Sequence, residues 1–205
     1  MNIPKLLTGD LNRLRFVVRY SSIFVLHKES VAEHCFYVTL YATMIADELR
    51  ESGIDINIET VMKKALFHDM EESRTGDVFR PFKYADPELK SRMETQARKE
   101  VAGILDRLNV SDQTRKAILG HWHHSKDDTM EGAIVAFSDY LSVLSYMLQE
   151  INCSNSSMLE QHHTMGTYMN LFNDSRYDFM RPLIQKAREI TTEYLGNGSG
   201  IKRIV

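Results

Sequence analysis

The sequence predicts an all-α fold. Apolar residues recur at helical spacing over most of the chain, and no strand-like alternation of useful length is found. Serine, asparagine and aspartate residues precede several of these apolar runs, as helix N-caps do, and glycine or proline separates the runs. With 205 residues, of which 43% are hydrophobic, the chain can bury a sizeable core. We predict one domain over residues 1–195 and a flexible C-terminal tail over residues 196–205.

The first long helix is predicted to begin after Ser30 and to end near Gly53. Ser30 and Glu33 have the spacing of a capping box, in which the serine oxygen accepts from the Glu33 amide and the glutamate reaches back. His34 lies in the first turn. Apolar residues then recur on one helix face at Val31, Cys35, Val38, Ala42, Ile45 and Leu49.

The second helix is predicted to run from Asn57 to about Glu72. It places His68 deep on an apolar face, with Glu72 one turn later on the same face. Gly76 breaks the helical pattern. Residues 73–85, which mix basic and aromatic side chains with Pro81, are expected to form an ordered loop.

The next two helices have clear start signals. Asp86 is predicted as the N-cap and Pro87 as the first-turn residue of a long helix that runs to about Leu108. The stretch SDQTRKAILGHWHH then predicts a short helix that ends in the histidine cluster His121, His123 and His124.

Another helix is predicted to run to about Ile151. We expect Asp128 and Glu131 to cap it, and it is apolar on almost every side around Asp139. The polar linker NCSNSS follows it. Two further helices are expected near residues 157–172 and 178–195.

Composition narrows the classes of partner. The formal net charge of -3 gives no basic field for a nucleic-acid polymer, and no apolar run has membrane-spanning length. The only cysteines, Cys35 and Cys153, make no disulfide framework, and the start MNIPKLLTGD lacks the apolar region of a secretory signal. We therefore expect a cytoplasmic protein that acts on neither nucleic-acid polymers nor membranes.

Two histidines and two aspartates need an explanation because they occupy apolar helix faces. A buried ionised carboxylate such as Asp139 must be protonated, paired with a cation or bound to a metal, and its neighbours YLSVL include no cation. Taken singly, His34 reads as a hydrogen-bonded core residue and Asp139 as a member of an ion pair. Together with the adjacent His68 and Asp69, they form a mixed nitrogen and oxygen set that suits a divalent transition metal better than calcium. The joint pattern favours a hydrolytic metal site.

The order H...HD...D, at His34, His68-Asp69 and Asp139, resembles that of the HD-domain metal phosphohydrolases. Within them the chain is most similar to the YfbR-like 5'-deoxynucleotidase branch. The segments LNRLRFVVRY, ESVAEH and HDMEESRTGDVFRPFKY carry this resemblance, which extends from about Leu11 to about Glu150. It implies an HD-domain helical bundle.

The resemblance also implies roles for individual residues. It implies one divalent metal ion, which is Co, Mn, Zn or Mg. The implied ligands are His34, His68, Asp69 and Asp139, and Asp69 is also implied to be a catalytic residue. Glu72 matches the acid that handles the attacking water and the leaving-group proton, with Glu71 as the competing candidate. Arg19 matches a phosphate-binding arginine, Asp77 matches a carboxylate that binds the sugar 3'-hydroxyl, and Lys83 belongs to the KY pair at the substrate.

One departure from the family pattern leaves the substrate open. Tyr20 stands where the nucleotidase branch has a tryptophan beside the sugar 2'-position, so the resemblance does not extend to strict selection of deoxyribose. Further cationic candidates near the loop are His27, Lys28, Arg74 and Arg80. Extra positive charge suits a longer phosphate chain.

Three functions are therefore carried forward. The preferred one is hydrolysis of deoxynucleoside monophosphates. The alternatives are a dNTP triphosphohydrolase, which the similar compact HD enzymes of phages exemplify with dATP, and a catalytically inactive nucleotide sensor. The intact Glu72 argues against the sensor. The resemblance suggests a homo-oligomer, and the base preference and a second metal at His121, His123 and His124 stay open.

Overall fold

The computed structural model describes residues 1–78, 80–83 and 85–195, with the side chains of 80, 81, 159–164 and 195 excepted. Within these residues the chain forms helices and no strand, apart from an isolated antiparallel bridge between Val18 and Ser30. The α-helices are α1 (Ile3–Thr8), α2 (Val31–Glu51), α3 (Ile58–Phe67), α4 (Glu72–Thr75), α5 (Arg80–Lys83), α6 (Pro87–Leu108), α7 (Asp112–His123), α8 (Met130–Asn152), α9 (His162–Asn170) and α10 (Arg181–Leu195). The 3₁₀-helices are η1 (Asp10–Arg15), η2 (Ser156–Gln161), η3 (Leu171–Asn173) and η4 (Ser175–Met180). This confirms the all-α fold class.

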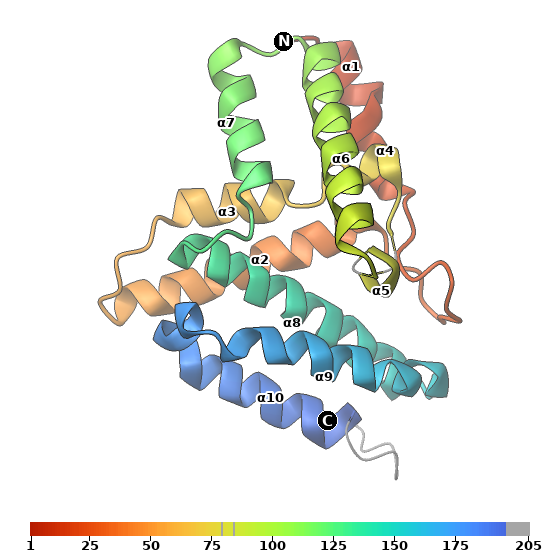
Figure 1. Ribbon diagram of the computed structural model, residues 1–205, viewed down its shortest axis with the longest axis vertical. Coiled ribbons are helices and arrows are strands. Elements are labelled where there is room, and N and C mark those ends of the chain that lie inside the picture. Colours follow the sequence, from red (N-terminus) through yellow and green to blue (C-terminus); the bar gives the residue numbers. More distant parts are fainter. Residues whose placement is uncertain (79, 84, 196–205) are drawn as a thin grey trace.

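The long helices α2 and α8 form the centre of the molecule. They pack against each other, and α3 contacts both of them. Helices α9 and α10 lie along α8 on one side of the molecule, whereas α6 and α7 extend from the opposite side, with α1 next to α6 (Figure 1).

Two clusters of buried apolar side chains stabilise this arrangement. The larger cluster joins α2, α3 and α8 to the C-terminal helices, and the smaller one lies beneath α6 and α7. Ala65 belongs to the larger cluster and Met70 to the smaller one. His68 and Asp69 therefore lie where the two clusters meet.

The helix starts that the sequence predicts are largely confirmed. Ser30 accepts from the Glu33 amide at 3.2 Å, and the Glu33 carboxylate accepts from the Ser30 amide at 2.7 Å, so the capping box is present. Asp86 caps α6 with Pro87 in the first turn. Ser111 caps α7 in the same way.

The predicted second helix is interrupted. It ends at Phe67, and the next residues make i to i+3 hydrogen bonds, from Met70 to Phe67 and from Glu72 to Asp69, before α4 begins. The His68 ring contributes to this tighter turn because its Nδ1 atom donates to the Ala65 carbonyl at 2.7 Å. The prediction that His68 and Glu72 share one continuous helix was wrong.

Other boundaries also differ from the predictions. The loop expected at 73–85 contains α4 and α5. The cap of α8 is Thr129, not Asp128, and Glu131 accepts instead from the Asn57 amide at 3.0 Å. The helix expected near 157–172 is divided into η2, α9 and η3, and the last helix begins as η4.

The predicted tail at 196–205 lies outside the described residues. Among the residues that the structure describes, no helix combines the length and apolar character needed to cross a membrane.

Candidate metal centre and active site

The four predicted ligands converge from three parts of the chain. His34 comes from the first turn of α2, His68 and Asp69 follow α3, and Asp139 lies in the middle of α8. His34 Nε2 lies 3.1 Å from an Asp139 oxygen and 3.6 Å from an Asp69 oxygen. His68 Nε2 lies 2.9 Å from Asp69, and ligand atoms of His34, His68 and Asp139 are all within 4.8 Å of one another.

Both imidazole rings are oriented by hydrogen bonds at their outer nitrogen. His34 Nδ1 lies 3.0 Å from the Ser142 hydroxyl, and His68 Nδ1 donates to the Ala65 carbonyl. The Nε2 atoms therefore face inward. Each is buried and has no hydrogen-bond partner of suitable geometry. Histidine ligands at metal sites have this arrangement: one ring nitrogen is free to bind the metal, and a hydrogen bond at the other nitrogen fixes the orientation of the ring.

This donor set fits a divalent metal ion. Burial, and next the Arg19 charge, lower the pKa of His34 to about 4, so its ring is neutral as a metal ligand must be. Burial would lower the pKa of His68, but the Asp69 carboxylate raises it above its ordinary value. A metal ion bound at His68 Nε2 would replace the proton that Asp69 favours there, so the convergent nitrogens and carboxylates can hold one cation.

Asp139 has two partners that the sequence did not reveal. Its Oδ1 faces His34, while its Oδ2 accepts from Lys126 Nζ at 2.6 Å and from the Tyr168 hydroxyl at 2.7 Å. Burial would raise the pKa of Asp139, yet the Lys126 charge and the two histidines hold it well below its ordinary value. The sequence neighbours of Asp139 include no cation, but Lys126 reaches it from the α7–α8 loop, so Asp139 is a member of an ion pair, as its single-residue interpretation allowed.

Arg19 lies beside this centre and is held by its own carboxylate. Its Nη1 donates to Glu29 at 2.5 Å, and its backbone amide donates to the Glu29 carbonyl at 2.9 Å. The Arg19 side chain is 11% exposed, and the negative charges of Asp139 and Asp69 stabilise its positive charge. A fixed guanidinium of this kind can bind a phosphate oxygen close to the four ligands.

Tyr20 and Asp77 lie together next to Arg19. The Tyr20 amide donates to Asp77 Oδ2 at 3.3 Å, and its ring stacks on Tyr146 with centroids 5.0 Å apart and planes 3° apart. Tyr20 has a φ of 57°, which is uncommon for a residue with a side chain and costs free energy. The Tyr20 hydroxyl is buried without a hydrogen-bond partner. The structure thus brings Arg19, Tyr20 and Asp77 into one group.

The two adjacent glutamates are in different environments. Glu71 Oε2 accepts a hydrogen bond from the Trp122 indole nitrogen of α7 at 2.6 Å, so this oxygen already has a partner. Glu72 has a buried oxygen with no hydrogen-bond partner. Burial, and then the neighbouring Asp69 charge, raise the pKa of Glu72 well above its ordinary value. This geometry favours Glu72 as the proton-transfer group.

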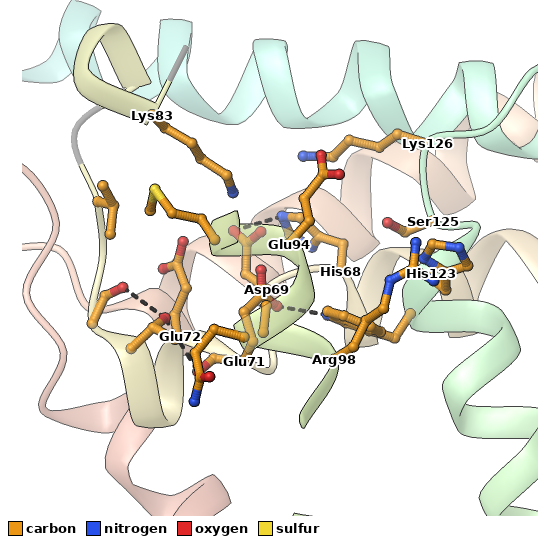
Figure 2. Close-up of a pocket in the computed structure, with 17 residues that line it drawn as sticks. His68, Asp69, Glu71, Glu72, Lys83, Glu94, Arg98, His123, Ser125 and Lys126 are labelled. Atoms are coloured by element: carbon orange, nitrogen blue, oxygen red, sulfur yellow. Dashed lines mark hydrogen bonds and ion pairs between the residues drawn. The ribbon is translucent and has the colours of Figure 1, made fainter. Parts of the chain in front are cut away.

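A cavity of about 340 Å³ adjoins the centre between α4, α6 and α7. His68, Asp69 and Glu72 line it together with Lys83, Arg98 and Lys126. Lys83 and Lys126 extend into it from different sides, toward the region next to Asp69 (Figure 2). The structure therefore brings Lys83 to the predicted site.

The other basic candidates lie elsewhere or make other contacts. Arg74 pairs with Glu100 at 3.2 Å and Asp10 at 3.4 Å on the outer side of α4. His27 pairs with Glu150 at 3.1 Å, Lys28 is exposed, and the side chain of Arg80 is outside the described part. His123 and His124 are exposed, and no group of three potential metal ligands among the described residues includes a member of the cluster with His121.

The helical fold and a centre of two histidines and two aspartates define the class of HD-domain proteins. The fold is similar to that of a crystal structure titled HD-domain phosphohydrolase from Listeria innocua, with a TM-score of 0.68 and 23% identity over 94% of this chain and 100% of that one. It is also similar to a Pyrococcus horikoshii protein, with a TM-score of 0.71 and 17% identity over 92% of this chain and 99% of that one.

The family follows from the sequence match. The model described as 5'-deoxynucleotidase YfbR-like matches residues 7–186, so the chain belongs to the YfbR-like family. Proteins named 5'-deoxynucleotidase are similar to it: one from Klebsiella pneumoniae is 26% identical, covering 74% of this chain and 75% of that protein. One from Photorhabdus laumondii is 28% identical, covering 72% and 74% respectively. The chain is thus a hydrolase, a phosphohydrolase of the 5'-deoxynucleotidase type.

Proposed function

We propose that this protein hydrolyses 2'-deoxynucleoside 5'-monophosphates to a deoxynucleoside and phosphate. The observation that carries the proposal is the buried centre in which the unpartnered Nε2 atoms of His34 and His68 face two carboxylates. Arg19 and Glu72, which can bind phosphate and move a proton, lie beside it. The names of the similar proteins support the same substrate class.

The centre would hold one divalent ion, Co, Mn, Zn or Mg, through its two histidines and two aspartates. When bound, such an ion supplies positive charge for a phosphate oxygen and lowers the pKa of water. Lys126 and Tyr168 fix the outer oxygen of Asp139, so its inner oxygen stays directed at the site.

The residues of the chain then have separate tasks. The Arg19 guanidinium, held by Glu29, donates to the non-bridging phosphate oxygens and stabilises the charge that grows on them. Lys83 adds a second positive charge from α5. Asp77 accepts from the sugar 3'-hydroxyl, and the Tyr20 ring lies against the sugar.

Glu72 completes the reaction as the proton-transfer group. As the water oxygen forms its bond to phosphorus in line with the leaving group, the Glu72 carboxylate takes a proton from that water. The bond between phosphorus and the 5'-oxygen breaks, and the proton goes to the 5'-oxygen. The products are the deoxynucleoside and phosphate.

One observation favours a second candidate, hydrolysis of a dNTP to a deoxynucleoside and triphosphate. Three cationic side chains, Lys83, Arg98 and Lys126, line the same cavity among four acidic ones, so a divalent ion at the centre would make the formal charge of the lining positive. Positive charge at one cavity suits a longer anionic chain. In both reactions the water attacks the phosphorus that carries the 5'-oxygen.

A product assay tests both candidates. Metal-stripped protein is supplied with Mn, Co, Zn or Mg and incubated with dNMPs, dNTPs and their ribose counterparts, and phosphate is separated from triphosphate by chromatography. We expect phosphate from dNMPs. Intact triphosphate from dNTPs would replace the proposal by the second candidate, and no product with any metal would favour a nucleotide sensor.

A substitution at Glu72 separates an enzyme from a sensor. Glu72→Gln removes the proton acceptor and should lower kcat by about 10²–10⁴-fold while metal content is kept. Glu94→Gln is the matched control, because Glu94 lines the same cavity but is exposed and pairs with Lys90 at 3.5 Å. Full activity in Glu72→Gln would remove Glu72 from the mechanism.

We further assign the enzyme to the cytoplasm. Cys35 is buried and Cys153 is exposed, and both are free thiols. Free cysteines are typical of reducing compartments. Fractionation of cells that express the protein would test this assignment, and recovery outside the cytoplasmic fraction would contradict it.

A further inference from the structure

Cys35 is a buried residue that the proposed mechanism does not use. Its side chain is 5% exposed, and its thiol is free. Among the described residues, neither of the two apolar clusters includes Cys35, although Val38 and Ala42 on the same face of α2 belong to the larger one. The burial of this thiol therefore needs an explanation other than packing in the apolar core.

The Cys35 sulfur lies beside the metal centre. Cys35 directly follows His34 in α2, and its sulfur, a ring nitrogen of His68 and a carboxylate oxygen of Asp69 all lie within 4.8 Å of one another. This set of three donors shares His68 with the set formed by His34, His68 and Asp139. The two sets therefore belong to one centre, which has five potential donors.

The His68 ring shows that the shared side of the centre is built for a ligand. Its side chain is buried, and its Nε2 atom has no hydrogen-bond partner of suitable geometry. Nδ1 donates to the Ala65 carbonyl at 2.7 Å, so the ring cannot turn toward another partner without breaking that hydrogen bond. A buried polar atom without a partner costs free energy, which a bound ion offsets.

The fifth donor differs in kind from the other four. Imidazole nitrogens and carboxylate oxygens together suit several divalent ions, including manganese, cobalt and zinc. A cysteine sulfur is a soft ligand that favours zinc over manganese and magnesium, and it loses its proton when it binds the ion. Protein zinc sites combine cysteine, histidine and carboxylate ligands. A sulfur donor therefore shifts the preference of such a centre toward zinc.

We propose that Cys35 is a ligand of the metal centre and that its sulfur makes the centre prefer zinc to manganese and magnesium. Cys35 is not among the described residues that line the cavity at α6 and α7, but it lines a groove between η1, α2 and α3. Its sulfur would therefore leave the substrate side of the centre open. The inference rests on the metal centre of the proposed function and not on its substrate, so it is tested without turnover.

Absorption spectroscopy of the cobalt-loaded protein tests the proposal. A cobalt ion bound by a cysteine sulfur has a sulfur-to-metal charge-transfer band in the near ultraviolet, which nitrogen and oxygen ligands do not give. Metal-stripped native protein, kept reduced with a phosphine, should develop this band when it is titrated with Co²⁺. Cys35→Ser should bind cobalt without the band. The matched control is Cys153→Ser, which should keep the band because Cys153 is an exposed free thiol at the end of α8.

Metal competition measures the preference. The dissociation constants of zinc and manganese are determined against a fluorescent chelator for the native protein and for Cys35→Ser. Loss of a group that only orients a ligand already costs about 10–100-fold in affinity, so Cys35→Ser should weaken zinc binding at least about tenfold. Manganese binding should weaken much less, because manganese is suited by oxygen ligands.

Each result supports the proposal or overturns it. A native cobalt protein without the charge-transfer band would overturn it and leave the four-ligand centre in place. A band that persists in Cys35→Ser would also overturn it, and equal weakening of zinc and manganese, or unchanged zinc binding, would assign Cys35 a packing role. Absence of any cobalt binding would refute the metal centre itself and the proposed function with it. Circular dichroism confirms that each variant is folded, and Cys35→Ala replaces a serine variant that does not fold.

Discussion

Removal of the Tyr168 hydroxyl tests how the metal centre is held in position. In the native chain this hydroxyl donates to Asp139 Oδ2 at 2.7 Å, and Lys126 Nζ donates to the same oxygen at 2.6 Å. Tyr168→Phe keeps the ring and deletes only the hydroxyl. Asp139 then has one outer partner in place of two, so its inner oxygen is held less firmly toward His34.

The expected magnitude follows from this contact. A hydrogen bond to a charged group contributes about 1.5–3 kcal/mol. Because Lys126 still holds Oδ2, we take the lower end, and about 1.4 kcal/mol corresponds to a tenfold change in an equilibrium constant. Loss of a group that orients a metal ligand costs about 10–100-fold in affinity. We therefore expect Tyr168→Phe to bind Mn or Zn roughly tenfold more weakly.

The assay is competition between metal-stripped protein and a fluorescent chelator. Tyr140→Phe is the matched control, since Tyr140 is fully buried, stacks edge-on against Tyr168 at 5.3 Å, and bonds Thr191 rather than a ligand. Both variants should lose some stability, but only Tyr168→Phe should lose metal affinity. Equal metal dissociation constants for Tyr168→Phe and the native protein, or an equal loss in the control, would refute the reasoning.

Three further predictions concern stability. Gly132→Ala places a Cβ 2.5 Å from the Asp127 carbonyl oxygen and should lower the free energy of unfolding in urea by about 1–3 kcal/mol. The matched control is Gly120→Ala, whose Cβ would meet no neighbouring atom within 4 Å and should not lower it. Equal effects of the two substitutions would contradict this prediction. Burial would raise the pKa of Glu150, but hydrogen bonds from Leu26, Asn155 and His27 lower it. The Glu150 carboxylate therefore contributes fully to the free energy of unfolding above its unfolded pKa, which is near 4.3. This contribution is lost as the pH falls through the lower pKa of the folded state. The stability difference between the native protein and Glu150→Gln should therefore shrink from pH 7 to pH 3, and a constant difference would disprove the role. Metal at 100 times its Kd should stabilise the native protein by about 2.7 kcal/mol in thermal melts, and the same gain in a His34→Ala variant would exclude the proposed ligand set.

Local signals in the sequence predicted much of the fold. The capping box at Ser30 and the Asp86-Pro87 pair act through adjacent backbone amides, so they can be recognised without tertiary contacts. The cap of α8 was misplaced by one residue. Asp127 lies beside it and pairs with the buried Lys64 at 2.7 Å, so tertiary contacts help to set this turn.

The site residues that belong to the family motif could be predicted from the sequence. The residues that reach the site only through contacts between distant parts of the chain could not. The four proposed ligands converge because they lie on α2, on α8 and in the turn that follows α3, and these three helices pack together. Lys126 and Tyr168 were missed because nothing near them in the sequence marks them as partners of Asp139. The choice between Glu71 and Glu72 also needed the structure, because the Trp122 indole bonds Glu71 whereas a buried Glu72 oxygen has no hydrogen-bond partner.

The way the centre is divided along the chain has a consequence for biosynthesis. His34, His68 and Asp69 leave the ribosome early, but Asp139 lies in α8 and its partner Tyr168 in α9, near the C-terminal end of the bundle. The α2 and α8 helices must pair across this long separation, and contacts between distant parts of a chain form more slowly than local ones. A nascent chain therefore has an incomplete ligand set until α8 is synthesised and docked, and tight metal capture should mark the completed protein rather than a folding intermediate.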